Sequence, residues 1–168
     1  MLLRVSKAGW QRVAGDNFEF WWLNLKNKFL SFKTRARKEY QVEPRFIPHD
    51  PPRRYGKACV YGNFIFLAGE DSKDPNTQRV QGSTVVEQAE HLFQNMKATL
   101  ESLGSSLNNV IKYTVYLKDP RDRMNYQEAR VNYLPQNPPS TLIMGVDLAE
   151  PEMLIEIDAT AVIPERNK

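Results

Sequence analysis

The feature that most constrains the fold is a long amphipathic segment at 83–104, STVVEQAEHLFQNMKATLESLG. Its apolar residues recur every three or four positions, which is the spacing of one face of a helix. Thr84 and Glu87 have the spacing of a capping box at its start, and Gly104 suits its end. Such a helix must bury one apolar stripe, so it requires a sheet or a second helix to pack against.

Strand patterns flank this helix on both sides. The segment 58–69, ACVYGNFIFLAG, has two apolar runs around Gly62-Asn63 and predicts a hairpin. A second, shorter helix is expected over 122–134. Further strands are expected at 108–119, 141–147 and 153–163, which are rich in β-branched and apolar residues. The order β-β-α-β-α-β-β predicts an α/β fold with two helices on one face of a mixed sheet.

The last of these strands has two unlike faces. One face is apolar throughout and suits the helix side; it consists of Met153, Ile155, Ile157, Ala159 and Ala161. The other face mixes carboxylates with apolar residues and consists of Leu154, Glu156, Asp158, Thr160 and Val162. A half-apolar face without helices to cover it favours contact between subunits. A solvated face is the alternative.

The chain divides near a proline-rich break, HDPPRR at 49–54. We expect an N-terminal arm over 1–50 and a folded domain over 51–168. Residues 1–40 contain nine Lys and Arg against three Asp and Glu, a net charge of +6. Since the whole chain carries +3, residues 41–168 carry −3. The basic character therefore belongs to the arm, and a domain of negative charge makes nucleic acid an unexpected partner.

The arm has an aromatic stripe at helical spacing, followed by the basic run KTRARK. The stripe includes Phe18, Trp21, Trp22, Leu25 and Phe29. We expect it to dock on a protein partner; packing on its own domain and contact with an anionic membrane surface are the alternatives. Residues 1–15 lack acids and also fit an organelle-targeting segment.

Composition excludes several classes of protein. No run of about 18 apolar residues is present, so no membrane span is predicted. The single cysteine, Cys59, excludes an internal disulfide framework and fits a reducing intracellular compartment. Cys59 with two isolated histidines, His49 and His91, cannot form a zinc shell. No phosphate-binding glycine loop occurs, so we expect neither metal nor cofactor.

Three blocks carry a family likeness: YGNFIFLAG, EQAEHLFQNMKATLESLGSSLNNVIKYTVYLKD and PEMLIEIDATAV. Together they resemble the Rid family of reactive intermediate deaminases, also called the YjgF family, over roughly 55–163. The resemblance implies a chorismate-mutase-like α/β fold and a homotrimer, with the sheets around a central barrel and clefts at the subunit interfaces. Active members hydrolyse imines or enamines to a ketoacid and ammonia without a cofactor.

The resemblance also implies site residues. Glu156 falls on the glutamate that handles the water, Tyr55 on the cleft tyrosine, and Gly69 on the glycine of close approach. Glu70 stands where the family usually has glutamine. The cleft asparagine of the second helix falls on Gln127, in a stretch that aligns less securely.

Thr141 is the main departure from the family pattern, because it falls on the arginine that binds the substrate carboxylate. A hydroxyl cannot neutralise a carboxylate, whereas arginine forms a charge-assisted, two-pronged pair with it. If Glu70 lies beside Glu156, the cleft also repels anions. Arg54 or Lys57 is a candidate replacement cation; the alternative is that both are solvated.

Two functions remain open. The first is an imine or enamine hydrolase, a deaminase, acting on a substrate without a carboxylate in an inter-subunit cleft. The second is a non-catalytic Rid-like subunit of a larger assembly, recruited through its arm. The expected location is the mitochondrion or the cytoplasm. The missing arginine and the added arm favour the second function, and Glu156 and Tyr55 favour the first.

Overall fold

A computed structural model describes residues 25–26 and 43–165 of this chain of 168 residues. The chain divides into two units, Met1–Val42 and Glu43–Lys168. In the first unit only Leu25 and Lys26 are described, and both are helical. The other residues of the predicted stripe lie outside the described residues, namely Phe18, Trp21, Trp22 and Phe29. The docking role of the arm therefore stays a prediction.

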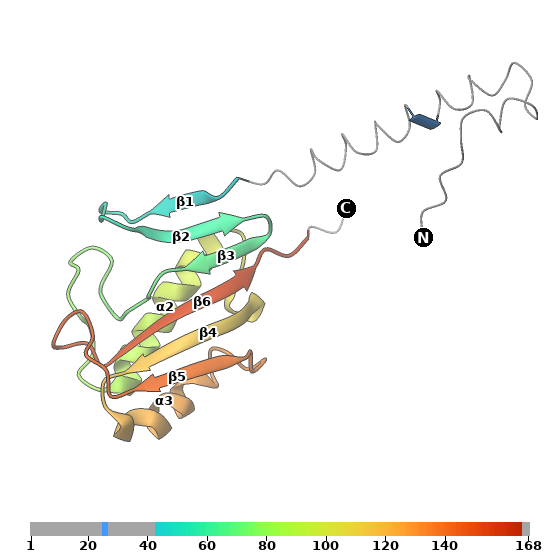
Figure 1. Ribbon diagram of the computed structural model, residues 1–168. Helices are drawn as coiled ribbons and strands as arrows, with labels where there is room; N and C mark the ends of the chain where they lie inside the picture. The colour runs from blue at the N-terminus through green and yellow to red at the C-terminus, as the bar shows by residue number, and fades with distance from the viewer. Residues whose placement is uncertain (1–24, 27–42, 166–168) are drawn as a thin grey trace, which may run out of the picture. The chain divides into compact units, whose positions relative to one another are not determined.

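The second unit is a six-stranded sheet with two α-helices on one face (Figure 1). The strands are β1 (Arg45–Pro48), β2 (Gly56–Tyr61), β3 (Phe64–Leu67), β4 (Val110–Leu117), β5 (Ser140–Met144) and β6 (Ile155–Val162). The α-helices are α2 (Val85–Ser102) and α3 (Arg123–Arg130), and short 3-10 helices precede β4 and α3 at Leu107–Asn109 and Pro120–Asp122. The predicted α/β fold, with two helices and a mixed sheet, is confirmed.

The strand order in the sheet is β1-β2-β3-β6-β4-β5. Only β4 and β5 pair in parallel, and α3 lies in the connection between them; the other neighbours are antiparallel. The hairpin of β2 and β3 turns at Gly62, whose φ of 62° is unfavourable for residues with a side chain. The last strand in sequence, β6, therefore lies between β3 and β4.

β1 is an element that the sequence analysis did not predict. It pairs with the edge of β2, with Phe46 opposite Cys59. It has four residues and ends at Pro48, so it is too short to give a recognisable alternation, and proline is accepted at the edge of a sheet. The sheet consequently begins before the proline-rich break.

The capping box predicted for α2 is present. The Thr84 hydroxyl accepts a hydrogen bond from the Glu87 amide at 3.3 Å, and the Glu87 carboxylate accepts one from the Thr84 amide at 3.1 Å. Ser83 donates to the same carboxylate, and together these bonds hold the Glu87 pKa below its ordinary value. Gly104, with φ of 81°, follows the helix end as expected.

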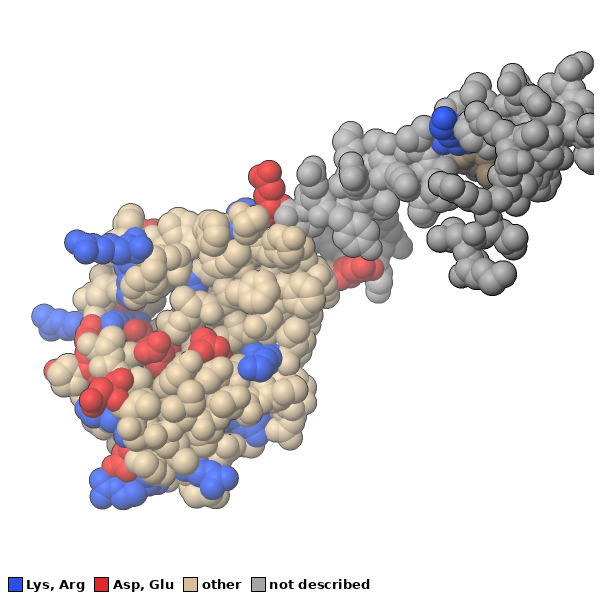
Figure 2. Space-filling view, viewed as in Figure 1, with Lys and Arg blue, Asp and Glu red and all other residues tan. Residues whose placement is uncertain are grey.

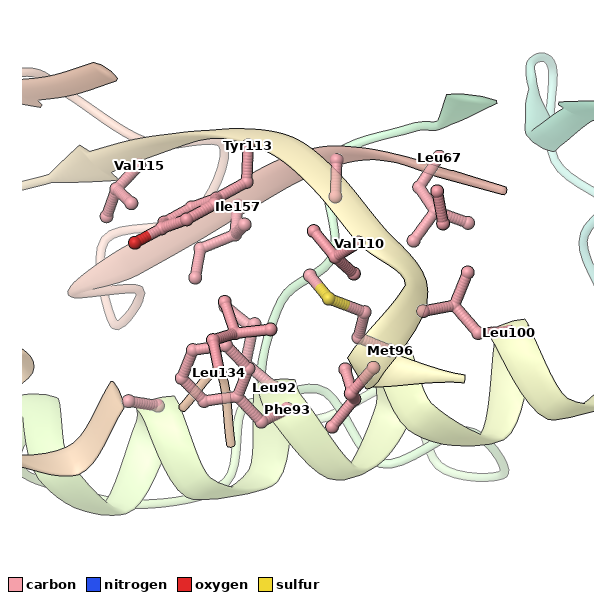
Figure 3. Close-up of a cluster of buried hydrophobic side chains, with 14 of the residues drawn as sticks. Leu67, Leu92, Phe93, Met96, Leu100, Val110, Tyr113, Val115, Leu134 and Ile157 are labelled. Carbon is pink, nitrogen blue, oxygen red and sulfur yellow. The ribbon is translucent and has the colours of Figure 1, made fainter. Parts of the chain in front are cut away.

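The core lies between the helices and the sheet (Figure 3). Phe93 of α2 is fully buried and stacks on Tyr133, with ring centroids 4.8 Å apart. Facing it, Ile155 and Ile157 of β6 are fully buried, while Glu156 between them points to the other face. The predicted alternation of β6 is therefore confirmed, and it places Glu156 on the face that the helices do not cover.

The uncovered face of the sheet is largely uncharged, with a few acidic side chains (Figure 2). Its exposed apolar residues come from strands across the whole sheet and include Phe46, Tyr61, Phe64, Phe66 and Ile143. Phe46 is 72 % exposed. Within residues 25–26 and 43–165, no helix is both long and apolar enough to cross a membrane.

Candidate functional site

The most constrained contact on the uncovered face joins Glu156 to Gly69. Glu156 lies on β6 opposite Tyr116 of β4, and Gly69 follows the end of β3. A Cβ atom on Gly69 would lie 1.8 Å from Oε1 and 2.7 Å from Cδ of Glu156. Only glycine leaves room for the carboxyl group to lie directly over the backbone at this point.

The surroundings of Glu156 favour its protonated form. Partial burial raises its pKa above the ordinary value, and the negative charges of Asp71 and Asp158 add to this effect, while Lys73 opposes it. Among residues 43–165, no donor is hydrogen-bonded to the Glu156 carboxylate. A carboxyl group with a raised pKa and free oxygens is suited to accept a proton and return it.

Glu70 does not share this face, and the expectation that it lies beside Glu156 is wrong. Its backbone pairs with Ile157, the amide of each residue bonding to the carbonyl of the other at 2.8 and 3.0 Å. Its side chain consequently points toward α2, where the Thr99 hydroxyl donates to Oε1 at 3.0 Å. Glu70 is 8 % exposed, and burial raises its pKa.

Asp71 and Asp158 provide the negative charge that was assigned to Glu70. The Asp158 carboxylate accepts a hydrogen bond from the Tyr116 hydroxyl at 3.0 Å. Asp71 pairs with Lys73 at 3.5 Å, but Lys73 also pairs with Glu150 at 2.6 Å, so its charge is shared. The uncovered face is therefore still unfavourable for an anion, but the negative charge beside Glu156 comes from Asp71 and Asp158 and not from Glu70.

Thr141 lies on β5, exposed, opposite Thr114 of β4. β4 separates β5 from β6, and neighbouring strands are about 4.8 Å apart, so Thr141 is about 10 Å from the strand that carries Glu156. One small substrate cannot touch both residues in the same subunit.

Tyr55 and Gln127 also lie apart from Glu156. Tyr55 follows the proline-rich break; its hydroxyl accepts a bond from Arg53 at 3.0 Å and its ring lies edge-on to His49. Gln127, on α3, accepts a bond from the Arg130 guanidinium at 3.2 Å. The structure therefore brings Gly69 and Glu156 together, but not the other predicted site residues.

Sequence reasoning placed some residues of interest and missed others. Asp158 lies on the same face of β6 as Glu156, as the alternation predicted. Asp71 belongs to an irregular loop and gives no periodic signal. Asn125 is an exposed asparagine on α3, two residues before Gln127, whose oxygen is already bonded. Lys57 is partly buried and lines a polar pocket.

No metal centre is visible in the part of the chain that the structure describes, where no group of three His, Cys, Asp or Glu residues converges.

Comparison with known proteins agrees with this fold. Residues 48–163 match the family model described as endoribonuclease L-PSP. A RutC family protein from Pyrococcus abyssi is 38 % identical over 107 residues, which cover 64 % of this chain and 84 % of that protein. A solved structure from Thermotoga maritima matches with a TM-score of 0.63 and 31 % identity. The match covers 72 % of this chain and 94 % of that protein.

Two eukaryotic relatives extend the comparison. The human protein named 2-iminobutanoate/2-iminopropanoate deaminase is 29 % identical over 108 residues, covering 64 % of this chain and 79 % of that protein. The mitochondrial protein MMF1 of Saccharomyces cerevisiae is 28 % identical over 113 residues, covering 67 % of this chain and 76 % of that protein. The family match over most of the described domain, with these relatives, shows that the chain belongs to the Rid/YjgF family.

Proposed function

We propose that this protein hydrolyses an imine or enamine that lacks a carboxylate, with Glu156 as the proton-transfer group. The observation that carries the proposal is the Glu156 carboxyl lying over Gly69, with its pKa raised and its oxygens free of other partners. The human relative named as an imine deaminase supports the reaction class. No metal or cofactor is required by this chemistry.

The reaction needs one water and one proton carrier. The imine carbon is already electrophilic, so positioning a water beside it supplies much of the catalysis. The Glu156 carboxylate takes a proton from that water as its oxygen bonds to the carbon, and then returns the proton to the nitrogen. Glu156 then carries the proton of the remaining hydroxyl to the nitrogen, and the carbon–nitrogen bond breaks as the oxygen forms the carbonyl, leaving a carbonyl compound and ammonia.

The site also requires a second subunit. Strands β5 and β6 are about 10 Å apart, and Thr141 is level with Asp158 and not with Glu156, so Thr141 and Glu156 of one subunit are too far apart to hold one small molecule. The exposed apolar side chains of the same face suit burial against another copy, in the homotrimer expected for the family. We propose that Thr141 of one subunit faces Glu156 of its neighbour.

Charge determines the class of substrate. Thr141 offers a neutral hydrogen bond, while Asp71 and Asp158 add negative charge around Glu156. A neutral or cationic imine therefore fits better than an imino acid. The substrates named for the human relative are imino acids, so we expect the specificity to differ.

The test compares two imines generated in place: iminopropanoate from alanine with an amino-acid oxidase, and a neutral aldimine from a primary amine with an amine oxidase. Ammonia release from the neutral imine should be the faster, and Glu156→Gln should reduce it by about 10²-fold or more. Thr141→Arg should raise turnover of iminopropanoate, whereas Thr141→Gln, of similar length but uncharged, should not. Efficient turnover of iminopropanoate by the unaltered protein would contradict the assignment of Thr141.

Thr141 also favours a second function. With threonine at the arginine position and an aromatic stripe in its first 42 residues, the protein also fits a non-catalytic subunit held in a larger assembly by its arm. Replacing Trp21 and Trp22 with alanine should then release it from that assembly while the trimer stays intact. The expected location is the mitochondrion, as for the yeast relative, or the cytoplasm.

A further inference from the structure

A small polar pocket borders Gly69, and Glu156 is not among the residues that line it. It has a volume of about 90 Å³ and is formed by the turn after β1, the start of β2, the loop after β3 and the middle of α2. Charged side chains of both signs gather at this end of the molecule, at the left of Figure 2. The site proposed above does not use this pocket.

Most of the polar groups that line it already have partners within the protein. Arg53 donates to the Tyr55 hydroxyl at 3.0 Å and to the Gln78 side-chain oxygen. Lys73 is held between Asp71 and Glu150. Asn95 donates to the backbone oxygens of Asp71 and Lys73 at 3.0 and 2.8 Å, so it supports the loop.

Three side chains in the pocket have polar atoms without a partner. The Lys57 side chain has no ion-pair or hydrogen-bond partner among residues 43–165, although its charge is close enough to influence Glu70. Glu70 uses Oε1 to accept from Thr99, and no donor reaches its second oxygen. His49 has a buried Nε2 atom without a hydrogen-bond partner. Polar groups held in this way, unpaired around a cavity, are the usual means of fixing a small ligand.

The charges of the lining select the ligand. The cations Arg53, Lys57 and Lys73 are balanced by the carboxylates Asp50, Glu70 and Asp71. A pocket without net charge gives no advantage to a simple anion or cation, but it can bind both ends of a dipolar molecule. With about 90 Å³, against about 300–1,000 Å³ for drug-sized ligands, the pocket admits only a few heavy atoms.

We propose that this pocket binds a small zwitterion of the amino-acid type, with its carboxylate on Lys57 and its ammonium group on Glu70. His49 Nε2 completes the hydrogen bonds. Lys57 and Glu70 form no ion pair within 4.0 Å, so a ligand can lie between them instead of competing with a direct contact. The proposal does not depend on imine hydrolysis, because Lys57, Glu70 and His49 have no part in that reaction; the two sites share only the Gly69 backbone and the charge of Asp71.

The experiment is calorimetric titration of the full chain with four matched probes: glycine, acetate, methylammonium and acetamide. Glycine should bind, and each of the other three should bind at least about tenfold more weakly, because each lacks one or both charged ends. Glycine should also raise the melting temperature, since it binds only the folded chain. Equal binding of acetate or methylammonium, or the absence of glycine binding, would overturn the proposal.

Two variants locate the site. Glu70→Gln keeps the shape of the side chain and an oxygen for Thr99, and Lys57→Met keeps the length of the stem; each should weaken glycine binding at least about tenfold. Glu156→Gln is the matched control, because it removes a carboxylate that contacts Gly69 but does not line the pocket, and it should leave glycine binding unchanged. Should Glu70→Gln fold poorly by circular dichroism, Lys57→Met decides alone. Unchanged affinity in Lys57→Met, or a loss in Glu156→Gln, would refute the assignment.

Discussion

Replacing Gly69 with alanine tests the contact on which the proposed site depends. Gly69 is not among the glycines with positive φ, so alanine brings no backbone strain there. Its added Cβ would instead meet Oε1 of Glu156 at 1.8 Å, where an ordinary contact needs about 3.4 Å. The carboxyl group must therefore move by about 1.6 Å.

The movement should cost little stability and much activity. The displaced atoms are the end of a flexible side chain, so the expected loss is the cost of a poor rotamer, about 1 kcal/mol. For a domain of this size that loss lowers the melting temperature by about 3–6 °C. A catalytic group moved by more than 1 Å loses about 10²-fold in rate, so kcat/KM for the neutral imine should fall by that factor.

A double-mutant cycle separates the two effects. Glu156→Ala removes every atom that the new Cβ would meet within 3.1 Å, so Gly69→Ala should cost almost nothing in that background. Urea denaturation should give a coupling free energy of about 1 kcal/mol between the two positions. Gly62→Ala is the control: its Cβ meets nothing within 4 Å, but its φ of 62° should cost a similar stability while activity is kept.

Two results would refute the reasoning. If Gly69→Ala retains full turnover, the position of the Glu156 carboxyl does not matter for the reaction. If the stability loss persists in the Glu156→Ala background, the clash lies elsewhere than in the side chain that the structure identifies.

Three further predictions concern stability. Phe93→Ala should lower the free energy of unfolding by about 3–5 kcal/mol in urea denaturation, because the ring is fully buried against Tyr133; a loss under 1 kcal/mol would contradict that packing. Thr84→Ala should cost about 1 kcal/mol through loss of the cap, and Thr84→Ser should restore it. Burial raises the Glu70 pKa, so the folded state holds a proton that the unfolded state releases, and stability falls as pH rises from the ordinary pKa through the raised one. Glu70→Gln should remove this fall. In denaturation curves, the free energy of unfolding of the variant relative to that of the unaltered protein should therefore rise across this pH interval. A difference that does not change with pH would exclude a raised pKa for Glu70.

Much of the fold was predictable because its elements carry strong periodic signals. The helix at 85–102 has a cap, a stripe and a glycine stop, and the alternation of 155–162 assigned Glu156 to the correct face. β1 was missed because four residues ending in proline give no period to detect.

The site was harder to predict, because neighbours in sequence can point to opposite faces of a sheet. Glu70 follows Gly69 directly, yet its backbone pairing with Ile157 turns its side chain toward α2. One of the charges that act on Glu156, that of Asp71, comes from a loop without regular structure. The distance from Thr141 to Glu156 depends on strand order, which local patterns do not specify.

The central place of β6 has a consequence for how the protein is made. Until Ile155–Val162 leaves the ribosome, the sheet exists as two separate ribbons, one of β1, β2 and β3 and the other of β4 and β5, each with a bare edge. Of these six strands, the one that joins the ribbons is synthesised last, so both ribbons must wait with unpaired edges that can associate with other chains. The nascent sheet should therefore depend on rapid closure by β6, and a premature stop before Ile155 should yield an aggregating product, not a smaller folded one.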